Sequence, residues 1–138
     1  MAARDIFHNA VKAALQKEGW TITHDPLPRL YGGIDLYIDP GAERILAAER
    51  GDERIAVEVK SFLATSLVSE FHTALGQFLN YRLVLEEQDP ERELFLAVPF
   101  DTYNLFFTQP FPQLAIQRHH VKLIVYDAEQ EEITLWQS

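Results

Sequence analysis

The chain of 138 residues contains no cysteine, so disulfide bonds and thiolate metal sites are excluded. No stretch approaches the roughly 20 consecutive apolar residues that a membrane helix needs. The N-terminal segment is amphipathic, includes Asp5 and Glu18, and has no apolar block before a cleavage site, so no signal peptide is expected. These absences favour a cytoplasmic protein that does not associate with membranes.

Basic residues are also scarce. The sequence has 12 Lys and Arg against 21 Asp and Glu, a net charge of −9, whereas a protein that grips duplex DNA over a broad surface neutralises phosphates with many cations. Residues 1–82 carry 9 basic and 11 acidic groups, net −2, and residues 83–138 carry 3 and 10, net −7. An anionic substrate is therefore expected at the first part, while the acidic second part serves solubility or faces a partner protein.

What is present is typical of one globular α/β domain over residues 1–138, with 47% hydrophobic residues and no internal repeat or linker. Apolar spacing predicts helices over residues 6–18 and 66–87. Strands are expected at 20–24, 34–39, 44–50, 54–62, 93–100, 121–127 and 132–137, with short helical or irregular pieces over 102–119. This order predicts a mixed central sheet flanked by helices, with a C-terminal β-hairpin.

The expected strand at 54–62 carries two opposite charges. Side chains alternate along a strand, so Glu58 and Lys60 in "IAVEVKSF" share one face. The flanking Val and Ile residues suggest a central strand, where a lone charge is costly and calls for partners or a site. The alternative is an edge strand with a solvated ion pair, which is the commoner meaning of an isolated E-x-K pattern.

Two further features favour a site. Asp35 lies in "GGIDLYID", a strand expected beside the hairpin, and an aspartate and a glutamate from adjacent strands can offer oxygen ligands to Mg²⁺ or Mn²⁺. Lys60 beside such an ion could orient the attacking water or stabilise charge on a phosphate. Gln77 and Tyr81, one turn apart on the long helix, could hold that lysine or a phosphate, although alone they indicate only a helix boundary.

These residues, taken in order, resemble a known pattern. Asp35, then Glu58-Val59-Lys60, then Gln77-x-x-x-Tyr81 resemble the PD-(D/E)xK restriction-endonuclease-like superfamily. Stretches along nearly the whole chain, including "ARDIFHNAVKAALQKEGWTITHDPLPRLYGGIDLYI", "EFHTALGQFLNYR" and "ITLWQS", further resemble the XisH family, cyanobacterial fdxN element excision controlling factors. The resemblance implies a restriction-endonuclease-like fold, a role in programmed DNA excision during heterocyst development, and a small companion protein of the XisI type.

The resemblance also implies roles for single residues. Asp35 and Glu58 would be metal ligands, the Val59 carbonyl a third, and Lys60 the catalytic lysine, with Mg²⁺ or Mn²⁺ as the cofactor. Gln77 and Tyr81 match the helix motif of many nuclease relatives.

The first helix departs from the pattern. Archaeal junction resolvases resemble distant relatives of this chain, and in them the first helix contributes a glutamate to the metal site. His8 occupies that place here. Histidine can ligate a metal but leaves the site less anionic. A proline usual before the aspartate is replaced by Ile34.

Two functions follow, a metal-dependent nuclease acting on DNA, or a nuclease-fold module that binds a partner and regulates a separate recombinase. The remaining histidines lack the matched spacing of a zinc site. An aromatic series could stack single-stranded bases, but is more typical of a core or of an interface in a homo-oligomer. Its members are Phe95, Phe100, Tyr103, Phe106, Phe107 and Phe111.

Overall fold

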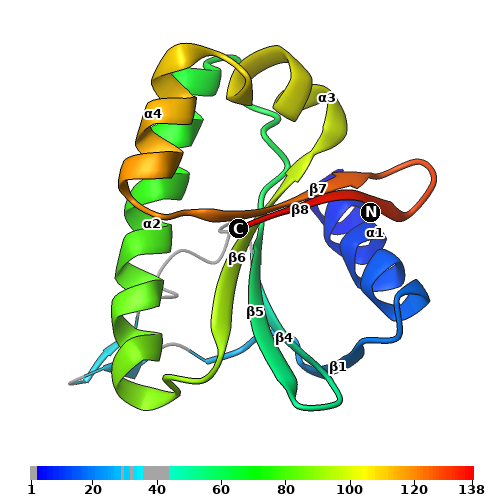
Figure 1. The fold of residues 1–138 in the computed structure, drawn as a ribbon, viewed down its shortest axis with the longest axis vertical. Helices are drawn as coiled ribbons and strands as arrows, with labels where there is room; N and C mark the ends of the chain where they lie inside the picture. Colours follow the sequence, from blue (N-terminus) through cyan, green and yellow to red (C-terminus); the bar gives the residue numbers. More distant parts are fainter. Residues whose placement is uncertain (1–2, 29, 32, 36–43) are drawn as a thin grey trace.

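The computed structural model, shown in Figure 1, describes residues 3–28, 30–31, 33–35 and 44–138. Its main sheet has six strands in the order β1-β4-β5-β6-β7-β8. β5 and β6 lie in the middle and run parallel, as do β6 and β7, whereas the other neighbours are antiparallel. The strands are β1 (Thr21–His24), β4 (Ile45–Arg50), β5 (Glu53–Val59), β6 (Glu93–Pro99), β7 (Lys122–Asp127) and β8 (Glu132–Gln137).

Helices cover both faces of this sheet (Figure 1). α1 (Ala3–Lys17) lies on one face and α2 (Leu67–Gln88) on the other. The segment after β6 forms α3 (Phe100–Thr102), the π-helical η1 (Tyr103–Phe107) and α4 (Pro110–Arg118). The mixed sheet flanked by helices and the C-terminal hairpin of β7 and β8 confirm the fold expected from the sequence. Among the residues described, no helix is long and apolar enough to cross a membrane.

The two faces of β5 belong to different hydrophobic clusters, because side chains alternate along a strand. Ile55, Val57 and Val59 pack with α1 residues such as Val11 and Leu15. Ala56 packs with β6 residues and with Phe71 and Phe78 of α2. Glu58, two positions after Ala56, therefore points its side chain toward α2.

Local signals in the sequence account for several element ends. The hydroxyl of Ser66 caps α2 by accepting a hydrogen bond from the Ser69 backbone N–H at 3.2 Å. After α1 the chain turns at Gly19, and the β4–β5 hairpin turns at Gly51, with φ of 90° and 60°. Both values lie in the left-handed region that glycine adopts without steric cost.

The aromatic series divides between core and surface. Phe95, Phe106 and Phe107 are buried, and Phe71 contacts the rings of Phe106 and Phe107 edge to face. Phe111 also contacts Phe71 but remains 52% exposed. The prediction of a core role therefore holds for the buried members of the series.

The strand expected over residues 34–39 differs from the sequence-based picture. Its described part, β3 (Ile34–Asp35), pairs with β2 (Leu30–Tyr31) in a separate two-stranded sheet. The position beside β4 is taken by β1, whose ladder already occupies the backbone groups on that edge. Residues 36–39 lie outside the described residues. The expectation that the strand of Asp35 adjoins the hairpin was thus wrong for Ile34–Asp35.

A buried arginine joins the chain segments at one end of the sheet. The guanidinium of Arg92, whose side chain is 3% exposed, donates to the Ile55 carbonyl at 3.0 Å and to Asp89 at 2.9 Å, and lies 3.4 Å from Glu49. It therefore connects β4, β5 and the segment that leads from α2 into β6. Arg54 pairs with the same Asp89 from the surface at 2.8 Å.

Replacing Arg92 by alanine is expected to lower the free energy of unfolding by about 2–3 kcal/mol, because it leaves the buried Ile55 carbonyl without its side-chain donor and removes one of the two arginines that pair with Asp89. Arg54→Ala is the matched control, since it removes a more exposed arginine from the same carboxylate and should cost about 1 kcal/mol or less. Urea denaturation of both variants measures the difference. Equal losses would contradict the structural role given to Arg92.

Candidate functional site

Glu58 and Lys60 lie at the centre of the sheet, on the face that α2 covers. Glu58 pairs with Ile45 of β4 and Leu96 of β6 and is fully buried, while Lys60 follows β5 directly and is 6% exposed. β5 has a neighbour on both sides, so the alternative of a solvated ion pair on an edge strand is excluded. Burying a carboxylate and an ammonium group here is costly unless both groups are well solvated by the protein.

Lys60 is held from three directions. Its Nζ donates to Oε1 of Gln77 on α2 at 2.6 Å. Its backbone N–H donates to the Ala97 carbonyl at 3.0 Å, which extends the parallel pairing of β5 and β6 beyond the last strand residue. Its carbonyl accepts from the buried Tyr126 hydroxyl at 2.9 Å. Backbone and side chain are therefore both fixed, and the ammonium group has a defined position.

The two residues of the helix motif have different surroundings, since Gln77 contacts Lys60 and Tyr81 lies in the hydrophobic core. Gln77 is half-buried and meets Lys60, as its spacing on the helix allowed. Tyr81, one turn later, is 3% exposed and belongs to the cluster between α2 and the sheet. The catalytic roles of both residues stay predictions.

The metal ligands inferred from the resemblance are described only in part. Asp35 closes β3, but its side chain lies outside the described residues. Val59 ends β5 with its side chain in the cluster on the α1 face, and the ligand role of its carbonyl stays a prediction. Within the described part of the chain, no group of three or more His, Cys, Asp or Glu side chains could hold a metal ion.

His8 lies in a charged cluster that sequence analysis missed. Its Nε2 is 2.8 Å from Oδ1 of Asp25, whose Oδ2 is 2.9 Å from Nζ of Lys12. Nε of Arg44 lies 3.8 Å from the same carboxylate. The only sequence signal was an acidic residue directly before Pro26, where the strand ends, and nothing in the sequence connected it to α1. The cluster joins α1, the end of β1 and the start of β4.

Burial sets the charge of this cluster. Burial lowers the pKa of His8 below 6.5, against the opposing effect of Asp25, and the charges of Arg44 and Lys12 lower it further. For Asp25, burial acts to raise the pKa, but the hydrogen bond from Lys12 and the charge and hydrogen bond of His8 outweigh it, so the pKa lies below 3.8. A neutral His8 ring beside an ionised Asp25 is therefore the state at neutral pH.

The two nitrogens of the neutral His8 ring differ in their hydrogen bonding. Nε2–H donates to Asp25, whereas Nδ1 is buried and has no hydrogen-bond partner among the residues described. Metal-ligating histidines usually donate their other ring N–H to a carboxylate or carbonyl in this way. The geometry is thus compatible with the predicted ligand role of His8, which stays a prediction.

With this geometry described, the chain can be compared with known proteins. The family model described as XisH protein matches residues 1–134. The chain belongs to the XisH family. No curated protein matches it.

Two solved structures are similar to this XisH chain over almost its full length. The crystal structure of an XisH family protein from Nostoc punctiforme PCC 73102 is 52% identical, with a TM-score of 0.90, over 97% of this chain and 100% of that chain. An fdxN element excision controlling factor protein from Anabaena variabilis is also 52% identical, with a TM-score of 0.89, over 97% of this chain and 99% of that chain.

Protonation of His8 is expected to destabilise the fold. Since the folded-state pKa is below 6.5, the folded protein resists a proton that the unfolded chain accepts, and stability falls as pH drops from 6.5 through the folded pKa. In EDTA-containing buffer, the free energy of unfolding should be lower at about pH 5.5 than at about pH 7.5. His8→Gln should flatten this difference, and His72→Gln, which changes an exposed histidine of α2, should not. The same slope in the His8 variant would contradict the assignment.

Proposed function

We propose that this XisH protein is an excision controlling factor in programmed DNA element excision, and that a PD-(D/E)xK nuclease-like site acts by metal-dependent phosphodiester hydrolysis. The excision role is supported by the similarity to the Anabaena variabilis factor. The nuclease-like site is supported by one observation above all, the burial of Glu58 and Lys60 on one face of the central strand with the ammonium group held by Gln77. A role on chromosomal DNA requires a cytoplasmic location.

The donor chemistry of the site suits Mg²⁺ or Mn²⁺. Both are hard cations that prefer carboxylate and carbonyl oxygens, which Glu58, Asp35 and the Val59 carbonyl would offer, and His8 would add a nitrogen. Glu58 is a buried carboxylate, a group whose negative charge is costly in an apolar core and is stabilised by a nearby cation. Such an ion supplies charge neutralisation at a phosphodiester and acidifies a water molecule.

The remaining steps belong to side chains of the chain itself. Nζ of Lys60 has two N–H groups besides the one that meets Gln77, and these can donate to a phosphate oxygen or align the attacking water. Gln77 accepts from the ammonium group, so it holds Lys60 in one orientation and saves the cost of ordering a flexible side chain during the reaction. Tyr81 supports this arrangement by packing α2 against the sheet.

If the protein is a metal-dependent nuclease, the purified protein with Mn²⁺ should nick or cut a DNA substrate. Lys60→Ala should then lower the cleavage rate by about a hundredfold or more, because it removes a cation that stabilises charge on the phosphate. The matched control is Lys122→Ala, which removes a partly exposed lysine that pairs with Glu93. Plasmid cleavage measures activity, and circular dichroism checks that each variant is folded. Cutting by folded Lys60→Ala at the rate of the unchanged protein would count against the site.

A second function is favoured by the charge of the chain. With a net charge of −9, the protein offers few cations for a DNA footprint of its own. As an inactive nuclease-fold module, it would bind an XisI-type companion and regulate a separate recombinase. The companion would then supply the DNA contacts.

Metal binding separates the two functions. Calorimetric titration with Mn²⁺ should give a binding signal for the unchanged protein, weakened at least tenfold in Asp35→Asn and in Glu58→Gln, because each change removes an anionic oxygen ligand. Asp5→Asn, which alters an exposed acid at the start of α1, should bind as the unchanged protein does. No signal from the unchanged protein, together with co-purification of an XisI-type protein, would select the regulatory module.

A further inference from the structure

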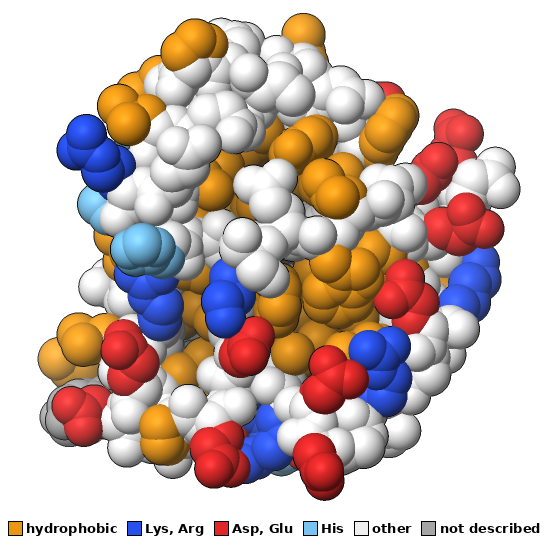
Figure 2. All heavy atoms as spheres, viewed as in Figure 1, with side chains coloured by type: hydrophobic (Ala, Val, Ile, Leu, Met, Phe, Trp, Pro, Cys, Tyr) orange, Lys and Arg blue, Asp and Glu red, His pale blue; other side chains and the backbone are white. Residues whose placement is uncertain are grey.

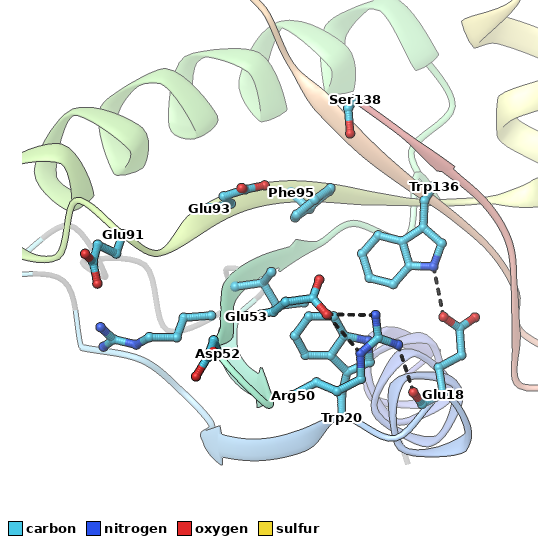
Figure 3. A pocket seen from close by; sticks show the side chains of 12 residues that line it. Glu18, Trp20, Arg50, Asp52, Glu53, Glu91, Glu93, Phe95, Trp136 and Ser138 are labelled. Atoms are coloured by element: carbon cyan, nitrogen blue, oxygen red, sulfur yellow. Dashed lines mark hydrogen bonds and ion pairs between the residues drawn. The ribbon is translucent and has the colours of Figure 1, made fainter.

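A cavity lies at the opposite end of the central strands from Lys60. It has a volume of about 600 Å³ and is bordered by the β4–β5 hairpin, the start of β6, the end of α1 and β8 (Figure 3). Glu53 and Glu93, the first residues of β5 and β6, line it, whereas Glu58 and Lys60 lie at the far end of β5. The length of a strand separates the cavity from the nuclease-like site.

Aromatic rings form one wall of this cavity. Trp20 and Trp136 stack with centroids 6.0 Å apart, and Phe95 meets Trp136 edge to face at 5.2 Å. Nε1 of Trp136 donates to Glu18 at 3.0 Å. Trp20 is 4% exposed, and its indole N–H has no hydrogen-bond partner among the described residues.

The wall already accommodates one cation. The guanidinium of Arg50 lies 4.5 Å from the centroid of the Trp20 ring. It is held there by Glu53 at 3.1 Å and by the Glu18 carbonyl at 2.9 Å (Figure 3). An aromatic face with carboxylates and carbonyls beside it is the environment in which proteins bind guanidinium and ammonium groups.

Carboxylates at the rim carry negative charge in excess of what the neighbouring bases neutralise. Glu53 pairs with Arg50 and Glu93 with Lys122, but Asp52 and Glu91 have no ion pair among the residues described. Arg54, the other base at the cavity, pairs with Asp89. Figure 2 shows acidic side chains around an apolar hollow on this face of the molecule.

We propose that this cavity binds an arginine or lysine side chain from a basic segment of a partner protein. Asp52 and Glu91 would pair with the incoming cation at the rim, and the Trp136 ring would contact its aliphatic part. Nucleic acid is disfavoured because its phosphates would meet unpaired carboxylates. The proposal concerns a docking site and does not depend on nuclease activity.

The chain provides its own probe for this cavity, because its two tryptophans, Trp20 and Trp136, both line it. A blocked Gly-Arg-Gly-Arg-Gly peptide should change the tryptophan emission saturably, and the peptide with neutral citrulline in place of arginine should not. Binding of the arginine peptide should weaken at higher salt, since charges at the rim contribute. Equal responses to both peptides, or no response to either, would overturn the proposal.

Variants that remove charge test whether the peptide binds at the carboxylates on the rim of the cavity. The double variant Asp52→Asn/Glu91→Gln should raise the apparent Kd for the arginine peptide at least tenfold, and both residues are exposed, so its thermal melt should match that of the unchanged protein. The control Glu86→Gln/Glu87→Gln makes the same charge change on exposed α2 residues and should leave Kd unchanged. Equal effects of the two double variants would overturn the proposal. So would an oligothymidine or spermine response stronger than that of the peptide.

Discussion

Charge in the middle of the sheet is the constraint on which the rest of this structure depends. β5 must pair on both edges to form the core, yet it places Glu58 and the following Lys60 on the buried α2 face. A position this deep tolerates charge only when polar partners surround it. Gln77 on α2 and the Tyr126 hydroxyl on β7 hold Lys60 from opposite sides of the sheet. The contacts of Lys60 therefore connect β5 to α2 and to β7.

The two ends of the central strands carry different side chains and therefore suit different ligands. At one end, Lys60 meets Gln77 on the α2 face, and a separate cluster beside the start of β4 holds a histidine neutral by burial and an ionised aspartate. At the other, tryptophan rings and unpaired carboxylates form a cavity that repels phosphates and suits cations. Part of the acidic charge that argues against a broad DNA surface thus lies where a protein partner is the better fit.

The sequence predicted those features that depend on periodicity and local signals. Alternation put Glu58 and Lys60 on one face, and helical spacing put Gln77 where it meets the lysine. It failed for Asp35, whose strand was expected beside the hairpin, because pattern reasoning cannot tell which of two short strands takes the edge of β4. It also missed Asp25, since the contact with His8 bridges two elements whose relative position no local pattern encodes.

By itself, the sequence determined the family, through its resemblance along nearly the whole chain. It also determined the order of helices and strands and the residue types at the buried strand, because these follow from local spacing along the chain. Only the tertiary structure decided that β1 borders β4, that burial keeps His8 neutral beside Asp25, and that Trp20 and Trp136 stack in the wall of a cavity. These features join residues far apart in the chain, up to 116 positions for the two tryptophans. Their contacts arise from packing of whole elements, which no short stretch of sequence specifies.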